Sequence, residues 1–236
     1  MGNGIQGLAD LKPGDIMFGP IGGAVGIGVG LGQLFLGEAF RAGRTSVRHV
    51  GIVVEASRTL PPGSVHEGVT YETEVITRPR LVQAMPHGAE EVPMMVDTHW
   101  TDRHAYARLM PDYAGQGDDA AAIARLMVQY KVAYSFASYG ALALWRWGIK
   151  TPKLEAWIGR RRPPIAWGHN LPPIQLPVEA ICSVLVDQAW SLAGKRVMSG
   201  VAHQAVTPGA MANELWRRRG TIWGGPGFLP NVGDQL

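Results

Sequence analysis

The first half of the chain consists of short β-type runs separated by turn residues. The run at residues 49–56 (HVGIVVEA) is dense in β-branched residues and predicts a strand. Shorter runs predict further strands at residues 15–18, 81–85, 90–96 and 104–110. The polar segment 57–80 contains Pro61-Pro62-Gly63 and predicts a loop or a hairpin insertion.

The second half follows helical spacing instead. After Asp118 and Asp119, which can cap a helix, apolar residues recur at 121, 123, 124, 127 and 128. Similar patterns predict helices at 134–147, 177–194 and 210–218, and from about Gly32 onward within the glycine-rich stretch 22–41. The proline-rich stretch 150–176 predicts a loop. Strands followed by helices predict an α+β fold.

Composition places the chain among globular proteins. With 236 residues, 46% of them hydrophobic and 17% charged, we expect one domain over 1–236, with insertions at about 57–80 and 148–176. The N-terminus lacks the basic and apolar regions of a signal peptide, and the stretch 21–36 is glycine-rich and short for a membrane span. These features predict a cytoplasmic protein, or one delivered by a phage or a specialised secretion route.

Cys182 is the only cysteine, which excludes an intramolecular disulfide and a multi-thiolate zinc site. The sequence has no HExxH motif and no GxGxxG dinucleotide fingerprint, so we expect neither a metal nor a cofactor. A cysteine in an apolar helix usually serves packing alone. Cys182 lies near the start of its predicted helix, however, where backbone N–H groups and the helix dipole stabilise a thiolate and an oxyanion.

A thiolate nucleophile needs a base within hydrogen-bond reach. His49 begins the strongest predicted strand, so a rigid element would hold it. A strand-end histidine bonded to the backbone is the alternative role for His49. The other histidines lie in polar, Pro/Gly-rich or weakly structured stretches: His66, His87, His99, His104, His169 and His203.

Four sequence blocks occur in an order that identifies a known family. They are Gly14-Asp15-Ile16, His49-Val50-Gly51-Ile52, residues 82–89 (VQAMPHGA) and Cys182-Ser183-Val184-Leu185-Val186, with Tyr134-Ser135-Phe136 and Thr207-Pro208 flanking the last one. This order resembles the permuted NlpC-type cysteine peptidases and amidases, a YiiX-like branch of the papain-like fold related to lecithin–retinol acyltransferases. The resemblance implies a circularly permuted papain-like fold, with a small antiparallel sheet packed against helices, and a Cys182–His49 catalytic pair.

The third catalytic position in that family is commonly a glutamate, and the matching residue here is Gln83. The amide oxygen of a glutamine can still accept the imidazole N–H, although it stabilises an imidazolium less than a carboxylate does. Glu74, in the insertion, is the second candidate. Glu55 is the third, because it lies on the same strand and the same face as His49 but too far along to reach the ring easily.

The resemblance implies a cysteine hydrolase that acts on an amide, with a peptidoglycan stem peptide as the expected substrate. Two alternatives stay open. One is an acyl-lipid or ester hydrolase or acyltransferase on the same fold, and the other is a non-catalytic structural or binding module, such as a phage virion component.

A basic stretch with tryptophans lies between Trp145 and Arg162. It contains Trp145, Arg146, Trp147, Lys150, Lys153, Trp157, Arg160, Arg161 and Arg162. A solvated loop with its aromatic residues in the core is the preferred interpretation, and weak contact with anionic wall polymer or a membrane surface is the alternative. The net charge of +3 adds little to the second interpretation. No specific nucleic-acid binding is expected, and the oligomeric state stays open.

Overall fold

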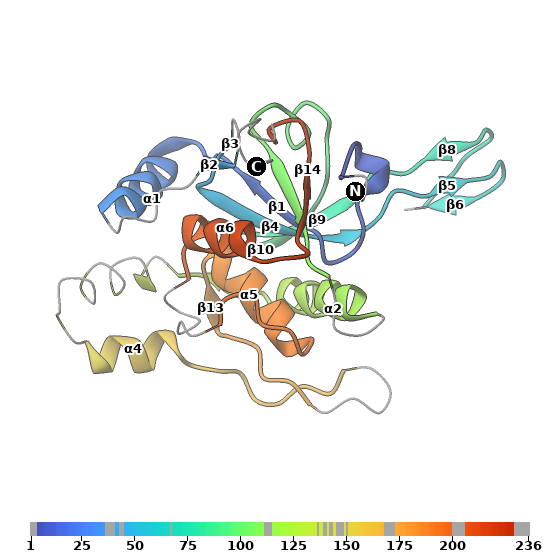
Figure 1. The fold of residues 1–236 in the computed structure, drawn as a ribbon. Coiled ribbons are helices and arrows are strands. Elements are labelled where there is room, and N and C mark those ends of the chain that lie inside the picture. The colour runs from blue at the N-terminus through green and yellow to red at the C-terminus, as the bar shows by residue number, and fades with distance from the viewer. Residues whose placement is uncertain are drawn as a thin grey trace.

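The computed structural model describes residues 4–35, 41–42, 45–66, 68–110, 115–135, 137–138, 141, 144, 149, 151–167, 173–199 and 206–228. These residues form a mixed α/β structure in which an antiparallel sheet packs against helices (Figure 1). None of the described helices combines the length and the apolar character that a membrane crossing requires.

Six described strands form the main sheet, and all neighbouring strands in it are antiparallel. In spatial order they are β10 (Gly88–Pro93), β9 (Arg80–Met85), β4 (His49–Glu55), β1 (Ile16–Gly19), β11 (Ala105–Arg108) and β14 (Ile222–Gly224). β4 lies inside the sheet and is buried from His49 to Val54, which suits its β-branched sequence.

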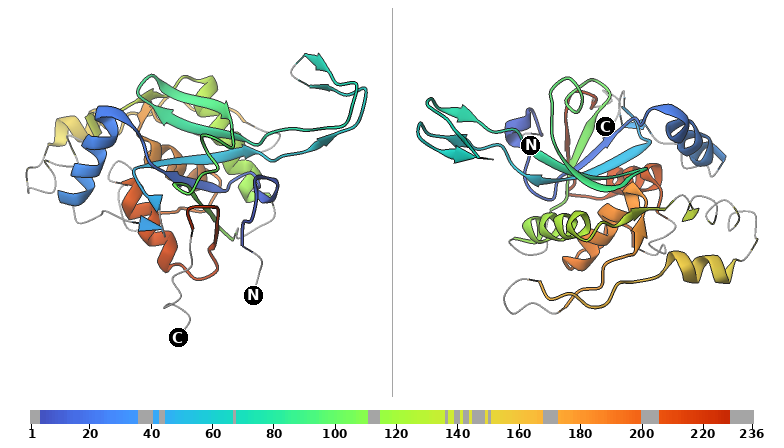
Figure 2. Two further views of the ribbon diagram at one scale, coloured as in Figure 1. Left: turned by 90° about the horizontal axis from the view of Figure 1, so that it is seen from above. Right: turned by 180° about the vertical axis from the view of Figure 1, so that it is seen from behind.

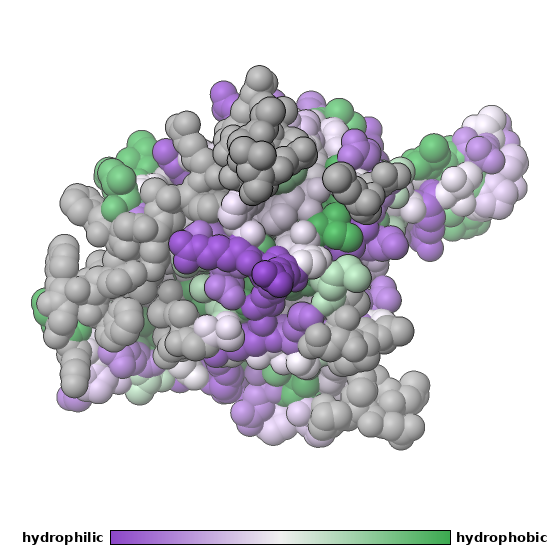
Figure 3. Space-filling view, viewed as in Figure 1, coloured by the Kyte–Doolittle hydropathy of each residue, from purple (hydrophilic) through white to green (hydrophobic). Residues whose placement is uncertain are grey.

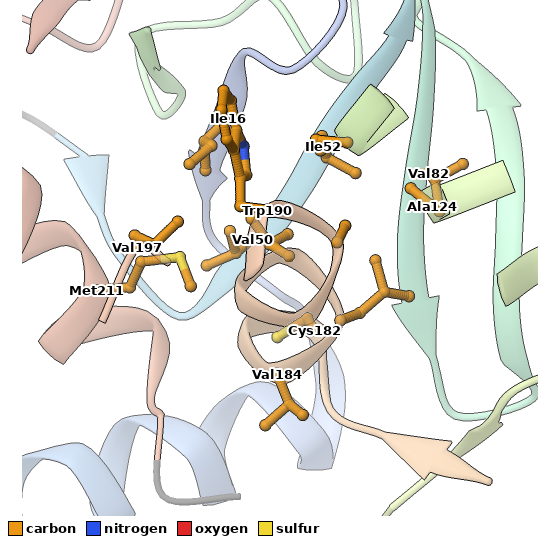
Figure 4. Close-up of a cluster of buried hydrophobic side chains, with 14 of the residues drawn as sticks. Ile16, Val50, Ile52, Val82, Ala124, Cys182, Val184, Trp190, Val197 and Met211 are labelled. Atoms are coloured by element: carbon orange, nitrogen blue, oxygen red, sulfur yellow. The ribbon is translucent and has the colours of Figure 1, made fainter. Parts of the chain in front are cut away.

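Three helices cover one face of the sheet: α2 (Gln116–Gln129), α5 (Cys182–Leu192) and α6 (Pro208–Arg217) (Figure 1). Their buried side chains pack against alternate strand residues, and this helix-side core includes Val50, Ile52 and Cys182 (Figure 4). The other face carries a smaller outer core, formed by Ile5, Leu11, Met17, Val53, Leu81, Met94 and Tyr106. The sheet therefore separates two hydrophobic clusters.

An arm projects from the sheet between β4 and β9 (Figure 1 and Figure 2). Its strands are β5 (Thr59–Leu60) paired with β8 (Val75–Ile76), and β6 (Val65–His66) paired with β7 (Val69–Thr70). The segment expected to be a loop or hairpin insertion is thus a hairpin arm. Val65, Val69 and Ile76 are exposed on it, and Figure 3 shows hydrophobic residues along its length.

Shorter elements complete the described structure. They are the 3₁₀ helix η1 (Leu8–Asp10), α1 (Gly23–Phe35), β2 (Arg41–Ala42), β3 (Thr45–Ser46), β12 (Ala133–Tyr134), α4 (Pro152–Ile158) and β13 (Glu179–Ala180). β2 pairs with β3 in antiparallel fashion, whereas β12 and β13 form a parallel pair.

The structure corrects two predictions about where helices form. α1 begins at Gly23, well before the predicted start near Gly32, because glycine weakens a helix without forbidding it when apolar residues alternate with it. α4 occupies part of the stretch that was predicted to be a loop. Pro152 stands at the start of that helix, where the missing N–H would have no intrahelical acceptor in any case.

Three further helix predictions are wrong in detail. The helix predicted from residue 177 begins only at Cys182, because Glu179–Ala180 pairs with β12 as a strand. For the same reason Tyr134 is in a strand rather than in a helix, and much of the predicted helix 134–147 lies outside the described residues. Asp118 and Asp119 stand in the first turn of α2 instead of capping it, and Gly115 occupies the cap.

Candidate functional site

Cys182 is the first residue of α5, in the helix-side core, and it is 1% exposed. The preceding Ile181 has an extended backbone, and its carbonyl accepts the first intrahelical bond, from Leu185 N–H at 2.9 Å. The N–H groups of the first helical turn have no intrahelical acceptor, and the helix dipole is positive at this end. Cys182 therefore stands where an anion is stabilised.

His49 is the first residue of β4 and is 4% exposed. Its Nε2 lies 2.8 Å from Oε1 of Gln83, which sits diagonally across on β9 because Gln83 pairs with Gly51. His49 Nδ1 is buried and has no hydrogen-bond partner among the described residues. Burial lowers the pKa of His49, so that its imidazole is mostly neutral at neutral pH.

The amide of Gln83 connects His49 to a carboxylate. Gln83 Nε2 donates to Oε1 of Glu90, which stands directly opposite on β10, at 2.8 Å. The second oxygen of Glu90 lies 2.8 Å from Nε2 of the exposed His87. We call His49, Gln83, Glu90 and His87 the Gln83 network. Sequence reasoning did not single out Glu90, and the signal that could have found it is a tight turn at Pro86-His87, which sets Glu90 opposite Gln83.

The alternation of side chains along β4 determines where His49 points. Val50 belongs to the helix-side core and Val53 to the outer core, so the His49 side chain lies on the outer side of the sheet. Gly19 pairs directly with His49. A Cβ at Gly19 would lie 2.4 Å from Cδ2 of His104, so the missing side chain provides the space for the His104 ring. His49 and His104 are therefore neighbours on this side.

The N-terminus of α5 lies at the end of the sheet where β4 begins. Farther along α5, Trp190 Nε1 donates to the carbonyl of Gly14 at 3.2 Å, and Gly14 N–H donates to the carbonyl of Val53 at 2.8 Å, near the opposite end of β4. Cys182 precedes Trp190 by about two helical turns, or roughly 12 Å, toward Val50 (Figure 4). Cys182 and His49 thus share one end of the sheet but belong to opposite faces, and no hydrogen bond joins them.

Gln83 is the candidate third residue that contacts His49. Glu55 does not share the face of His49, because a β-bulge after Val53 turns it toward α2. Its carboxylate lies 2.7 Å from Arg125 and 3.3 Å from Arg58. The expectation that Glu55 shares the face of His49 is therefore wrong. Glu74 is exposed on the arm and forms no hydrogen bond or ion pair with the described residues of the network.

Two histidines near His49 were not expected to lie there. The rings of His99 and His104 have their centroids 6.4 Å apart. Burial lowers the pKa of His99. Burial, with smaller effects of His99 and His49, lowers the pKa of His104 to about 4.

We expect the protein to lose stability between about pH 6.5 and pH 4 because of His104. The unfolded chain protonates this histidine near pH 6.5 and the folded protein only near pH 4, so the unfolded state binds more protons as the pH falls. Over this window His104 alone should lower the free energy of unfolding by about 3 kcal/mol, and His49 and His99, whose pKa values burial also lowers, act in the same direction. Urea denaturation at a series of pH values measures the effect. His104→Phe should flatten the loss while His66→Phe, in the arm, should not, and an equally steep loss in His104→Phe would contradict the assignment.

Trp157 corrects one expectation about the basic stretch. It is 42% exposed rather than in the core, and the guanidinium of Arg160 stacks over its ring at 4.6 Å. Trp145, Arg146, Trp147 and Lys150 lie outside the described residues, as do His169 and His203.

No protein-family model matches the chain, and no curated protein aligns with it significantly. Within the part of the chain that the structure describes, no group of three or more histidine, cysteine or acidic side chains is arranged to hold a metal ion.

Proposed function

We propose that the protein is a cysteine hydrolase with a circularly permuted NlpC-type papain-like fold, in which Cys182 is the nucleophile and His49 the base. The observation that supports this most is the state of His49. Gln83 occupies its Nε2, while Nδ1 is buried, with no hydrogen-bond partner among the described residues, at the end of the sheet where α5 begins. A buried polar atom left unpaired costs free energy, which a catalytic role would explain.

In the proposed reaction, Nδ1 of His49 takes the proton of the Cys182 thiol as Sγ attacks a carbonyl carbon. N–H groups in the first turn of α5 stabilise the oxyanion. His49 then returns the proton to the leaving amine, and water hydrolyses the thioester with His49 again as base. Gln83 holds the imidazolium through its amide oxygen. Because His49 and Cys182 lie on opposite faces of the sheet in this structure, the proposed reaction requires the two side chains to come within hydrogen-bond reach around the end of the sheet when substrate binds.

The proposed substrate is an amide in a peptidoglycan stem peptide, because the motif blocks around His49 and Cys182 resemble wall-degrading enzymes. Acyl-lipid or ester hydrolysis or acyl transfer is the alternative on the same fold. A wall substrate implies delivery by a phage or a specialised secretion route, whereas an acyl substrate also fits a cytoplasmic protein. Mass spectrometry of muropeptides and lipid esters incubated with the protein distinguishes the two substrate classes.

A non-catalytic binding or structural module is the second candidate function. It is favoured by the deep burial of Cys182 and by the position of His49 on the opposite face of the sheet. In such a module Cys182 packs the core and the Gln83 network only stabilises the hairpin of β9 and β10.

Alkylation of Cys182 by iodoacetamide across pH separates these two functions. A base-activated cysteine should react at pH 6.5 roughly tenfold faster or more than the same cysteine in the urea-unfolded chain, whose thiol pKa is about 8.5. His49→Gln should remove this advantage, and His66→Gln is the matched control that should keep it. A rate in the folded chain no higher than in the unfolded chain, or an unchanged rate in His49→Gln, would contradict the catalytic pair.

A further inference from the structure

Glu90 determines which way the Gln83 amide faces. A carboxylate only accepts hydrogen bonds, so the NH₂ group of Gln83 is turned toward Glu90 and its oxygen toward His49. The amide oxygen also only accepts, and so Nε2 of His49 carries the proton. A neutral imidazole has a single N–H, which leaves Nδ1 as the basic nitrogen.

We propose that Glu90 is a positioning residue that acts through Gln83 to hold His49 in the Nε2–H tautomer. The mechanism proposed above uses Nδ1 as the base, so the importance of Glu90 for catalysis rests on that proposed function. The tautomer itself rests only on the two hydrogen bonds of Gln83.

Gln83 alone does not select a tautomer, because a side-chain amide can rotate by 180°. In the rotated form its NH₂ group faces His49, which then needs a lone pair on Nε2 and a proton on Nδ1. With Glu90 present, rotation would place two acceptor oxygens 2.8 Å apart, the distance that now separates Gln83 Nε2 from Glu90. A carboxylate at position 83 could only accept a hydrogen bond from His49. Glu90 holds the Gln83 amide in the one orientation in which it does the same.

Two-bond ¹H–¹⁵N correlation spectra of the full chain report the tautomer directly. The signals of His49 are identified by their loss in His49→Gln. We expect the Nε2–H tautomer in the native protein at pH 7. In Glu90→Gln two amides face each other and pair in either orientation, so the ratio of Nε2–H to Nδ1–H forms should fall on the order of tenfold.

A double substitution provides a rescue. In Gln83→Glu/Glu90→Gln the new amide at position 90 donates to the new carboxylate at position 83, which accepts from His49 as Gln83 did. This variant should recover the Nε2–H tautomer. Glu91→Gln is the matched control, since Glu91 is the next residue on β10 and pairs with Arg80 and Arg125 away from the network. It should leave the tautomer unchanged.

An unchanged tautomer ratio in folded Glu90→Gln would overturn the inference, as would an equal change in Glu91→Gln. If Glu90→Gln does not fold, Glu90→Leu decides, because it also removes the acceptor of the Gln83 amide, and an unchanged Nε2–H tautomer there contradicts the role of Glu90. Failure of the proposed function is distinguishable: a tautomer change in Glu90→Gln, combined with a Cys182 that is unreactive in the native protein, supports the positioning role and rejects the hydrolase.

Discussion

Replacing Cys182 by alanine should reduce the proposed hydrolysis by roughly 10⁴-fold or more, because Cys182 is the proposed nucleophile and the hydroxyl of Ser183, its neighbour at the start of α5, is hydrogen-bonded to the carbonyl of Val206. Cys182 lies in the helix-side core, so the change also leaves a cavity. This cavity is only about the size of the missing sulfur atom. The rate is measured by mass spectrometry on the muropeptide and ester substrates of the proposed activity.

Ser183→Ala is the control for this experiment. Ser183 Oγ donates to the carbonyl of Val206 at 2.6 Å, so this variant should lose stability while keeping most of the activity. Hydrolysis that survives undiminished in Cys182→Ala would show that Cys182 is not the nucleophile. A fall of similar size in both variants would mean that the loss reflects damage to α5 rather than the missing thiol.

Replacing Asp15 by alanine should lower the free energy of unfolding by about 3 kcal/mol. Asp15 is 1% exposed, and its two oxygens accept from Nε and Nη2 of Arg108 at 2.8 Å and 2.6 Å. Its Oδ2 also accepts the backbone N–H of Lys12 at 2.9 Å, which closes the turn before β1. Alanine would leave the partly buried guanidinium without its partner. Urea denaturation at pH 7 measures the change.

The double variant Asp15→Ala/Arg108→Ala should cost less than the sum of the two single variants, because the second change removes the charge that the first leaves unpaired. Asp118→Ala, an exposed aspartate at the start of α2, should cost below about 1 kcal/mol. A loss in Asp15→Ala no larger than in Asp118→Ala would contradict a structural role for the Gly14-Asp15-Ile16 block.

The sheet was largely predictable because its strands carry their own local signals. β4 agrees with its prediction to within one residue at its end, because a run of β-branched residues favours a strand in any context. β14 was missed because three residues, Ile222–Gly224, become a strand only by pairing with β11. The start of α5 was misplaced for a similar reason, as the strand before it exists only through its pairing with β12.

The sequence selects the candidate residues of the site but not the connections among them. His49, Gln83 and Cys182 can be selected by residue type and motif order. Glu90 is not selected in this way, because its residue type does not distinguish it from Glu91. The turn at Pro86-His87, which sets the register of β9 against β10, decides which of the two faces Gln83. The separation of Cys182 and His49 by the sheet is equally invisible in the sequence, since it depends on which face α5 covers.

The parallel pair of β12 and β13 has a consequence for how the chain tolerates change. Ala133 lies opposite Glu179. The chain therefore leaves β12, makes a long excursion, and returns beside β12 directly before Cys182. Ser135 N–H donates to the carbonyl of Ala180 at 3.2 Å and strengthens the closure. Ile174 and Leu176 of the excursion pack in the helix-side core, so only its exposed part can be lengthened without disturbing the segment that leads into Cys182. A graft in that exposed part, such as a wall-binding domain, would change what is brought to Cys182 while leaving the thiol in place.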